Sequence, residues 1–162
     1  MEELFKYVAK GQQKTIDDLC RVVEHYMKYE VDGDCFSDEQ HFENAVRAVL
    51  AQASFDVREK QDVKNAVESI NERCFSDINR QIPDIEVHCS DGVVFLELKF
   101  RNSPQEYQKD IEKVANYLKH GKCDAAGVLF LDDTRRDGWK QCLKNTRYYY
   151  LWRIGKKAKL NM

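Results

Sequence analysis

Apolar and polar residues alternate along two neighbouring segments near the middle of the chain, residues 85–89 and 93–98. A period of two is typical of β-strands that bury one face. The dipeptide Asp91-Gly92 lies between the segments and is a strong hairpin signal. A turn centred there predicts an antiparallel hairpin whose apolar face pairs Cys89 with Val94, Val87 with Leu96 and Ile85 with Leu98.

The other face of the predicted hairpin is polar. The same register sets Asp84 opposite Lys99, Glu86 opposite Glu97, and His88 opposite Phe95. Carboxylates that face each other across a strand pair repel, and a hard divalent cation with oxygen ligands would neutralise them. A lysine two residues after a ligand carboxylate lies on the same face, where it can orient or activate an attacking water. This end of the hairpin is therefore the candidate site.

The residues Pro83-Asp84, followed by Glu97-Leu98-Lys99, resemble the motif of the PD-(D/E)XK nuclease superfamily. The resemblance implies that Asp84, Glu97 and the backbone carbonyl of Leu98 bind Mg²⁺ or Mn²⁺. It also implies that Lys99 serves the nucleophilic water. The ordinary alternative is an exposed hairpin face with an Asp84–Lys99 ion pair, of the kind that contributes about 0–1 kcal/mol.

The superfamily often adds a glutamate from an upstream helix, for which Glu39 and Glu43 are the candidates. We favour Glu43 as the metal-site and catalytic residue. Glu39 falls in the first helical turn, where stabilisation of the helix dipole accounts for a carboxylate without a metal. In some members a glutamine or lysine on the helix after the E-x-K strand joins the site, and Gln108 and Lys113 are available.

Helical periodicity accounts for much of the remaining chain. We expect helices over residues 2–10, 15–29, 61–74 and 104–120, another from Ser37 to an apolar stripe ending at Ala53, and strands over 55–58 and 125–131. The expected helix starts are Thr15 with Asp18, Ser37 with Gln40, and Ser103 with Pro104. The inner face of the last helix is expected at Tyr107, Ile111, Val114, Ala115 and Leu118.

The order of these elements predicts an α/β fold. A helix that joins the second hairpin strand to the apolar strand 125–131 makes a βαβ unit, which requires parallel strand pairing. The resemblance implies a restriction-endonuclease-like mixed central sheet flanked by helices, here with extra N-terminal helices. The 162 residues fit one domain with a helical extension (1–36), a nuclease-like core (37–134) and a basic aromatic segment (135–162).

Charge is distributed unevenly between these parts. Residues 1–134 hold 17 basic and 27 acidic residues, whereas residues 135–162 hold nine basic residues and Asp137, so the net charges are −10 and +8. The basic residues are interleaved with Trp139 and the run Tyr148–Trp152, a composition that suits a phosphate backbone and stacked bases. A half-buried strand followed by a solvated basic end explains the same residues equally well.

Other classes of protein receive less support. No apolar run approaches the length of a membrane span and no secretory signal is visible, so we expect a cytoplasmic protein without membrane contact. The six cysteines include no C-x-x-C spacing, which argues against a zinc site, and we expect free thiols.

The leading hypothesis is a Mg²⁺- or Mn²⁺-dependent nuclease that hydrolyses phosphodiester bonds in DNA or RNA. The alternative is a non-catalytic module on the same fold, which binds nucleic acid or protein. A small interaction protein ranks last because no motif supports it. Many duplex-cleaving enzymes need two active sites, so a homodimer is left open.

Overall fold

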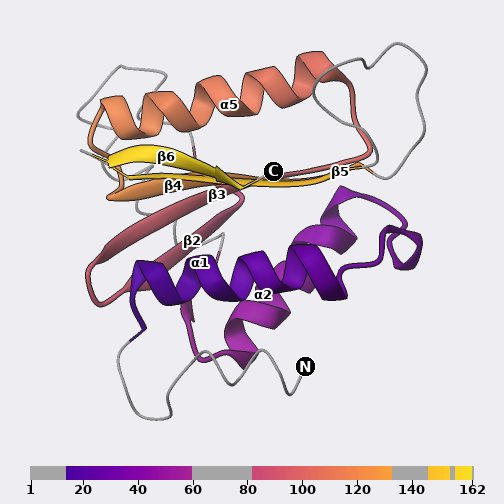
Figure 1. Cartoon of the computed structure of the whole chain (residues 1–162), viewed down its shortest axis with the longest axis horizontal. Coiled ribbons are helices and arrows are strands. Elements are labelled where there is room, and N and C mark those ends of the chain that lie inside the picture. Colours follow the sequence, from indigo (N-terminus) through magenta and orange to yellow (C-terminus); the bar gives the residue numbers. More distant parts are fainter. Residues whose placement is uncertain (1–13, 60–81, 133–145, 154–155, 162) are drawn as a thin grey trace.

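A computed structural model of the chain describes residues 14–59, 82–132, 146–153 and 156–161, the last two ranges by their backbone alone. These residues form a mixed α/β structure (Figure 1). The helices expected over residues 2–10 and 61–74, and the residue Trp139, lie outside the described residues.

One six-stranded sheet runs through the molecule in the order β1 to β6. Its strands are β1 (Asp56–Val57), β2 (Ile85–Cys89), β3 (Gly92–Phe100), β4 (Ala125–Asp132), β5 (Thr146–Arg153) and β6 (Lys156–Asn161). Neighbouring strands are antiparallel except β3 and β4, whose parallel pairing confirms the βαβ prediction. The aromatic run of the C-terminal segment lies in β5, within this same sheet.

Helices cover both faces of the sheet. The helix α5 (Pro104–Lys119) lies on one face, whereas α1 (Ile16–His25) and α2 (Glu39–Gln52) lie on the other (Figure 1). A π-helical turn, Tyr26–Glu30, and a 3₁₀ turn, Gly33–Cys35, connect α1 to α2. The arrangement confirms the α/β class and the mixed sheet flanked by helices.

The strand β3 is buried on both faces because helices cover it from both sides. Leu96 and Leu98 pack in the larger core with residues of α1 and α2. Phe95 packs on the α5 side, where its ring and that of Tyr117 lie 5.2 Å apart between centroids. Since successive side chains alternate between faces, Glu97 shares the α5 face with Phe95.

The helix starts were predicted with one error. Thr15 and Asp18 form the expected capping box at α1, and Ser103 caps α5 ahead of Pro104. At α2 the N-cap is Asp38 and not Ser37, because Asp38 Oδ1 accepts a hydrogen bond from the His41 amide at 2.8 Å. Asp and Ser are comparable N-cap residues, and here the Asp38 carboxylate makes the capping hydrogen bond, so the helix begins one residue later than expected.

The hairpin register differs from the prediction by two residues. Ile85 pairs with Leu96, Val87 with Val94 and Cys89 with Gly92, so Ser90 and Asp91 form the turn. A shift by two keeps each side chain on its predicted face and changes its partner. Glu86 therefore lies opposite Phe95 and not Glu97, and His88 lies opposite Val93 and not Phe95.

Contacts from outside the hairpin explain this register. The Ile16 amide, at the start of α1, donates a hydrogen bond to Asp91 Oδ1 at 2.8 Å. Asp124 Oδ2 accepts from the Val93 amide at 2.8 Å and lies 2.6 Å from where a Cβ on Gly92 would stand. Gly92 has a φ of +150°, so it serves the close approach of Asp124 at the start of β3 and not the turn.

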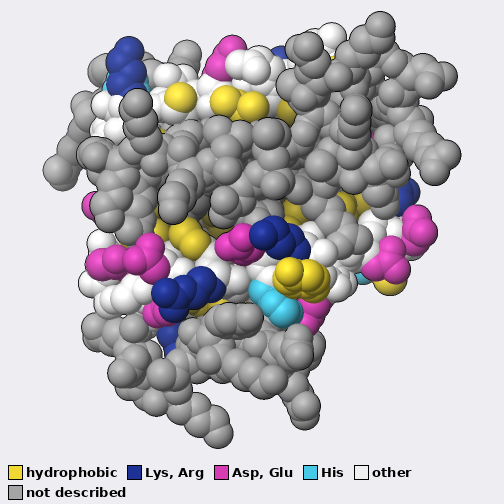
Figure 2. Space-filling view, in the orientation of Figure 1, with side chains coloured by type: hydrophobic (Ala, Val, Ile, Leu, Met, Phe, Trp, Pro, Cys, Tyr) yellow, Lys and Arg dark blue, Asp and Glu magenta, His cyan; other side chains and the backbone are white. Residues whose placement is uncertain are grey.

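Acidic and basic side chains lie side by side over the α1 and α2 layer in Figure 2. Ion pairs one helical turn apart occur in this layer, as between Lys28 Nζ and Glu24 Oε1 at 2.7 Å. None of the described helices combines the length and the apolar composition that crossing a bilayer requires.

Candidate active site

Glu97 lies in β3 and is only 2% exposed, in the interior between the sheet and α5. Tyr117 donates its hydroxyl group to Glu97 Oε1 at 2.9 Å, and Lys113 Nζ lies 2.9 Å from the same oxygen. Both partners come from α5, one helical turn apart. An isolated buried charge is strongly unfavourable, and these two donors offset part of that cost whenever Glu97 is ionised.

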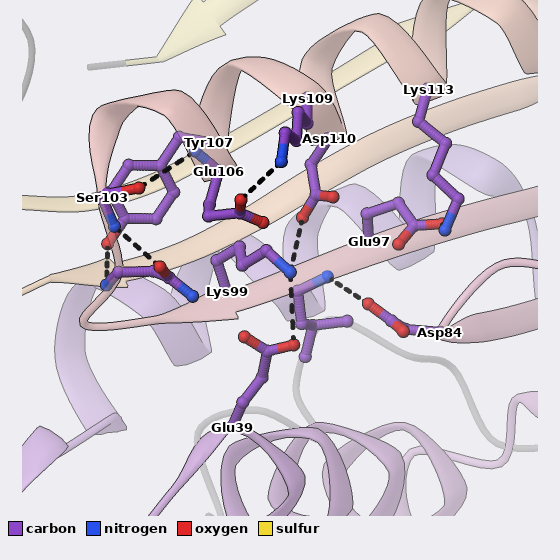
Figure 3. A network of polar contacts seen from close by, with 12 residues as sticks. Glu39, Asp84, Glu97, Lys99, Ser103, Glu106, Tyr107, Lys109, Asp110 and Lys113 are labelled. Carbon is purple, nitrogen blue, oxygen red and sulfur yellow. Dashed lines mark hydrogen bonds and ion pairs between the residues drawn. The ribbon is translucent and has the colours of Figure 1, made fainter.

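Asp84 directly precedes β2 and is held from two sides. Its Oδ2 accepts a hydrogen bond from the Leu98 amide at 2.9 Å, which sets the carboxylate against β3 near Glu97 (Figure 3). Its main-chain carbonyl accepts a hydrogen bond from Arg47 of α2, which also donates to the Arg58 carbonyl at 3.0 Å. Arg47 thereby connects α2 to the main chain at Asp84 and helps to fix the position of this residue.

Lys99 lies between two carboxylates that come from opposite layers (Figure 3). Its Nζ is 3.5 Å from Glu39 Oε1, in the first turn of α2, and 3.6 Å from Asp110 Oδ2, on α5. Asp110 is buried, and its Oδ2 has no hydrogen-bond partner among the described residues. Lys99 is thus a cation around which acids from separate elements gather.

The carboxyl groups of the site are harder to ionise than usual. Burial, together with the nearby Asp84 carboxylate, raises the pKa of Glu97 to about 8. Burial also raises the pKa of Asp110 to about 6 and raises the pKa of Glu39, in both cases against the opposing effect of Lys99. At neutral pH Glu97 therefore keeps a proton beside Asp84, which removes one of the two negative charges and with it their repulsion.

Lys99 differs from these carboxyl groups because its surroundings favour the charged form. Burial by itself lowers the pKa of Lys99, but the charges of Asp110 and Glu39, with a smaller effect of Asp84, outweigh burial and raise it. The group is therefore an ammonium ion with donors and no acceptor. It can hold a water molecule or an anionic oxygen, and it does not remove a proton at neutral pH.

The structure brings together three of the residues that the sequence singled out. Asp84, Glu97 and Lys99 meet where β2 begins and β3 ends, although the predicted pairing of Asp84 with Lys99 across the strands was wrong. The Leu98 amide contacts Asp84. The metal-binding role of the Leu98 carbonyl stays a prediction.

The two upstream glutamates differ in their contacts. Glu39, which we explained by the helix dipole, reaches Lys99. Glu43, which we favoured, is 4% exposed and accepts a hydrogen bond from Gln40 Nε2 at 2.6 Å on its own helix. Its part in the site stays a prediction.

Of the two candidates on the helix after β3, Lys113 joins the site through Glu97. Gln108 is exposed, and its Nε2 lies 3.4 Å from Glu112 Oε1 on the same helix. Helical geometry separates the two, since residues five positions apart lie on different faces of a helix with 3.6 residues per turn.

Sequence reasoning missed Asp110 and Tyr117. The residues that α5 buries are Tyr107, Asp110, Val114 and Tyr117, whereas Ala115 of the expected inner face is exposed. The helix is thus rotated about its axis relative to the prediction. The spacing of three and four residues from 107 to 117 was present in the sequence, but weighting by hydrophobicity alone excluded an aspartate from it.

The donor atoms of this cluster fit a hard divalent cation. They are carboxylate oxygens, the ligands that Mg²⁺ and Mn²⁺ prefer. Four carboxyl groups and two lysines meet here, which leaves two negative charges when all are ionised: Glu39, Asp84, Glu97, Asp110, Lys99 and Lys113. Within the described ranges no group of three or more His, Cys, Asp or Glu side chains has the geometry of a metal site. Mg²⁺ bound in proteins usually keeps several waters and needs only one or two protein carboxylates.

No family model, no curated protein and no solved structure matches the chain. The likeness to the PD-(D/E)XK superfamily accordingly rests on the motif residues themselves.

Proposed function

We propose that the protein is a nuclease with a restriction-endonuclease-like fold, which hydrolyses phosphodiester bonds in DNA or RNA with Mg²⁺ or Mn²⁺. The observation that supports this most is the meeting of Asp84, Glu97 and Lys99, which stand in the order of the superfamily motif. A surface ion pair is a poor explanation of this group, because Glu97 is buried and acids outnumber lysines around it.

In this proposal Asp84 and Glu97 hold the ion. The Leu98 carbonyl and a glutamate of α2, Glu39 or Glu43, are the further oxygen ligands on offer. When bound, the ion lowers the pKa of a water ligand and offsets the charge that builds up on the phosphate. To hold the ion, Glu97 would have to give up its proton, because metal and proton compete for the same carboxylate.

Lys99 works as a donor in this proposal. Its raised pKa keeps it protonated, so it orients the attacking water through the water's oxygen and stabilises negative charge on the phosphate. Lys113 and Tyr117 keep the Glu97 carboxylate in place from the α5 side. Each of these roles is compatible with the position of the residue in the structure.

Nucleic acid is the partner that this activity requires. Residues 135–162 hold nine Lys and Arg residues and one Asp, a composition that favours contact with phosphates. Their strands β5 and β6 continue the sheet that carries the site. A cytoplasmic location, and either a monomer or a homodimer, are compatible with the proposal.

Cleavage assays on the full chain test the proposal. The substrates are circular single-stranded DNA, linear duplex DNA and a structured RNA, each with Mg²⁺, Mn²⁺ or EDTA. We expect the wild type to cleave at least one of them with metal and none with EDTA. Asp84→Asn and Lys99→Ala should each lower cleavage at least about 100-fold, which corresponds to about 2.7 kcal/mol of transition-state stabilisation.

The control variant is Glu112→Gln, which removes an exposed charge on α5 and should cleave like the wild type. Undiminished cleavage by Asp84→Asn and Lys99→Ala would contradict the assignment of the site. A wild type that cleaves no substrate, but binds nucleic acid with an affinity that falls steeply with salt, would instead be the binding module. Mn²⁺ should also raise the melting temperature of the wild type more than that of Asp84→Asn, since it binds the folded state.

A further inference from the structure

Asp110 is a buried acid for which the proposed hydrolysis has no direct use. It lies on the buried face of α5 and is 6% exposed. Among the described residues its Oδ2 has no hydrogen-bond partner, and Lys99 Nζ lies 3.6 Å away. A buried carboxylate oxygen without a hydrogen-bond partner costs free energy that an apolar side chain of similar size would not. Hydrogen bonding to this oxygen therefore does not explain an aspartate at this position, and its contact with Lys99 is the interaction left to account for.

Lys99, by contrast, benefits from a second partner. A lysine carries its charge on a flexible four-carbon stem, and one partly exposed ion pair does not fix such a group. Glu39 attracts the ammonium group from the α2 layer at 3.5 Å and Asp110 attracts it from the α5 layer at 3.6 Å (Figure 3). Opposed attractions from two layers confine the group to the space between them.

The two partners of Lys99 are not equivalent. The Glu39 side chain is 37% exposed, whereas that of Asp110 is 9% exposed, so water and salt screen the contact with Asp110 less. Glu39 is also one of the further ligands on offer to a metal ion. If Glu39 held a metal ion instead of Lys99, Asp110 would be the carboxylate left in contact with Lys99.

We propose that Asp110 is a positioning residue, which holds the Lys99 ammonium group beside the Asp84 and Glu97 carboxylates. The inference rests on the proposed function, because it takes Lys99 as the residue that serves the nucleophilic water. Asp110 touches neither the water nor the phosphate and acts through Lys99 alone.

NMR of ¹⁵N-labelled lysine ammonium groups in the full chain tests the position of Lys99 without any substrate. An ammonium group that is held in place exchanges its protons slowly and gives a resolved signal. We expect such a signal for Lys99, assigned through its loss in Lys99→Arg. In Asp110→Asn, which keeps the shape and removes the charge, this signal should broaden beyond detection.

The control for this measurement is Glu112→Gln, which removes an exposed acid from the same helix and should leave the signal unchanged. Asp110→Ser, also uncharged, takes the place of Asp110→Asn should that variant fail to fold. A Lys99 signal that is missing from the wild type, or that persists unchanged in the uncharged variant, would overturn the proposal.

Cleavage kinetics add a readout that a merely structural role would not move. We expect Asp110→Asn to lower kcat about 10- to 100-fold with KM unchanged, because misplacing a catalytic group slows chemistry and not binding. Asp110→Glu keeps the charge and should restore part of the rate. A raised KM with an unchanged kcat would count against positioning. A wild type that does not cleave refutes the proposed function, whereas the NMR comparison still decides whether Asp110 holds Lys99.

Discussion

Glu97 shows how burial changes the protonation of a single residue. Its carboxyl group is buried between the sheet and α5, and Asp84 adds negative charge nearby, so its pKa is raised to about 8. Tyr117 and Lys113 donate to one of its oxygens. The folded protein therefore holds a proton on Glu97 under conditions in which the unfolded chain would release it.

The free energy of unfolding should consequently decrease as pH rises from about 5 to about 8. The unfolded Glu97 carboxyl ionises near its ordinary pKa of 4.5, whereas the folded one keeps its proton up to about 8. In this window the folded state binds more protons, so rising pH favours unfolding, by at most about 1.4 kcal/mol per unit of pKa difference. Asp110, with its pKa raised to about 6, acts in the same direction. Urea unfolding in metal-free buffer measures the effect.

The matched variant for this prediction is Glu97→Gln, which stays neutral at every pH. Its free energy of unfolding should decrease much less between about pH 5 and pH 8, so that it is more stable than the wild type at about pH 8. An identical pH dependence in the two proteins would show that Glu97 is not the group responsible.

At the scale of elements, the rotation of α5 about its axis decides which side chains reach β3. Tyr107, near the start of the helix, donates to Asp132 Oδ2 at 2.7 Å and accepts from the Asn102 amide at 2.8 Å. Its ring also packs on Phe130, with 4.6 Å between centroids. These contacts attach the first part of α5 to the end of β4, and so they orient the site residues further along the helix.

Tyr107→Phe should therefore lower the free energy of unfolding by about 1–3 kcal/mol, because a buried carboxylate loses a donor and an amide loses an acceptor. Urea unfolding at neutral pH measures it. Tyr29→Phe removes the same hydroxyl group from a residue that is 74% exposed, and it should change stability by less than about 0.5 kcal/mol. Similar losses in the two variants would contradict an anchoring role for Tyr107.

At the scale of the whole molecule, one sheet joins parts of opposite charge. Residues 1–134 carry an excess of acids and residues 135–162 an excess of bases, yet β5 pairs with β4 along its length. The acidic cluster around Lys99 is approached by α2 from one face of the sheet and by α5 from the other. Binding of a polyanion should therefore depend on the C-terminal strands and chemistry on the acidic cluster.

Charge removal in β6 should weaken nucleic-acid binding in a salt-dependent way. For Lys156→Gln/Lys157→Gln, the slope of log Kd against log salt should decrease by up to about 2 for duplex DNA, since each phosphate contact contributes about 0.9. Fluorescence anisotropy in EDTA measures binding without cleavage. Lys28→Gln/Lys119→Gln removes two exposed charges from other elements and should leave the slope unchanged. Equal effects would place the binding surface elsewhere.

Local interactions along the chain were enough to predict most of the elements. The capping residues Thr15 and Ser103, the alternation in β2 and β3, and the parallel pairing of β4 were all predicted correctly. Each depends on residues a few positions apart or on the length of one connection. For the same reason the sequence could predict that Asp84, Glu97 and Lys99 share one end of a hairpin.

Contacts between distant segments decided the rest. The hairpin register depends on Asp91 and Asp124, whose partners lie in other elements, so the local turn signal selected the wrong pair of residues. The acids that reach Lys99 come from α2 and α5 on opposite sides of the sheet. Only the packing of these helices on the sheet decides which of their side chains point toward β3. That packing brings Glu39 and Asp110 to Lys99 and buries Glu97.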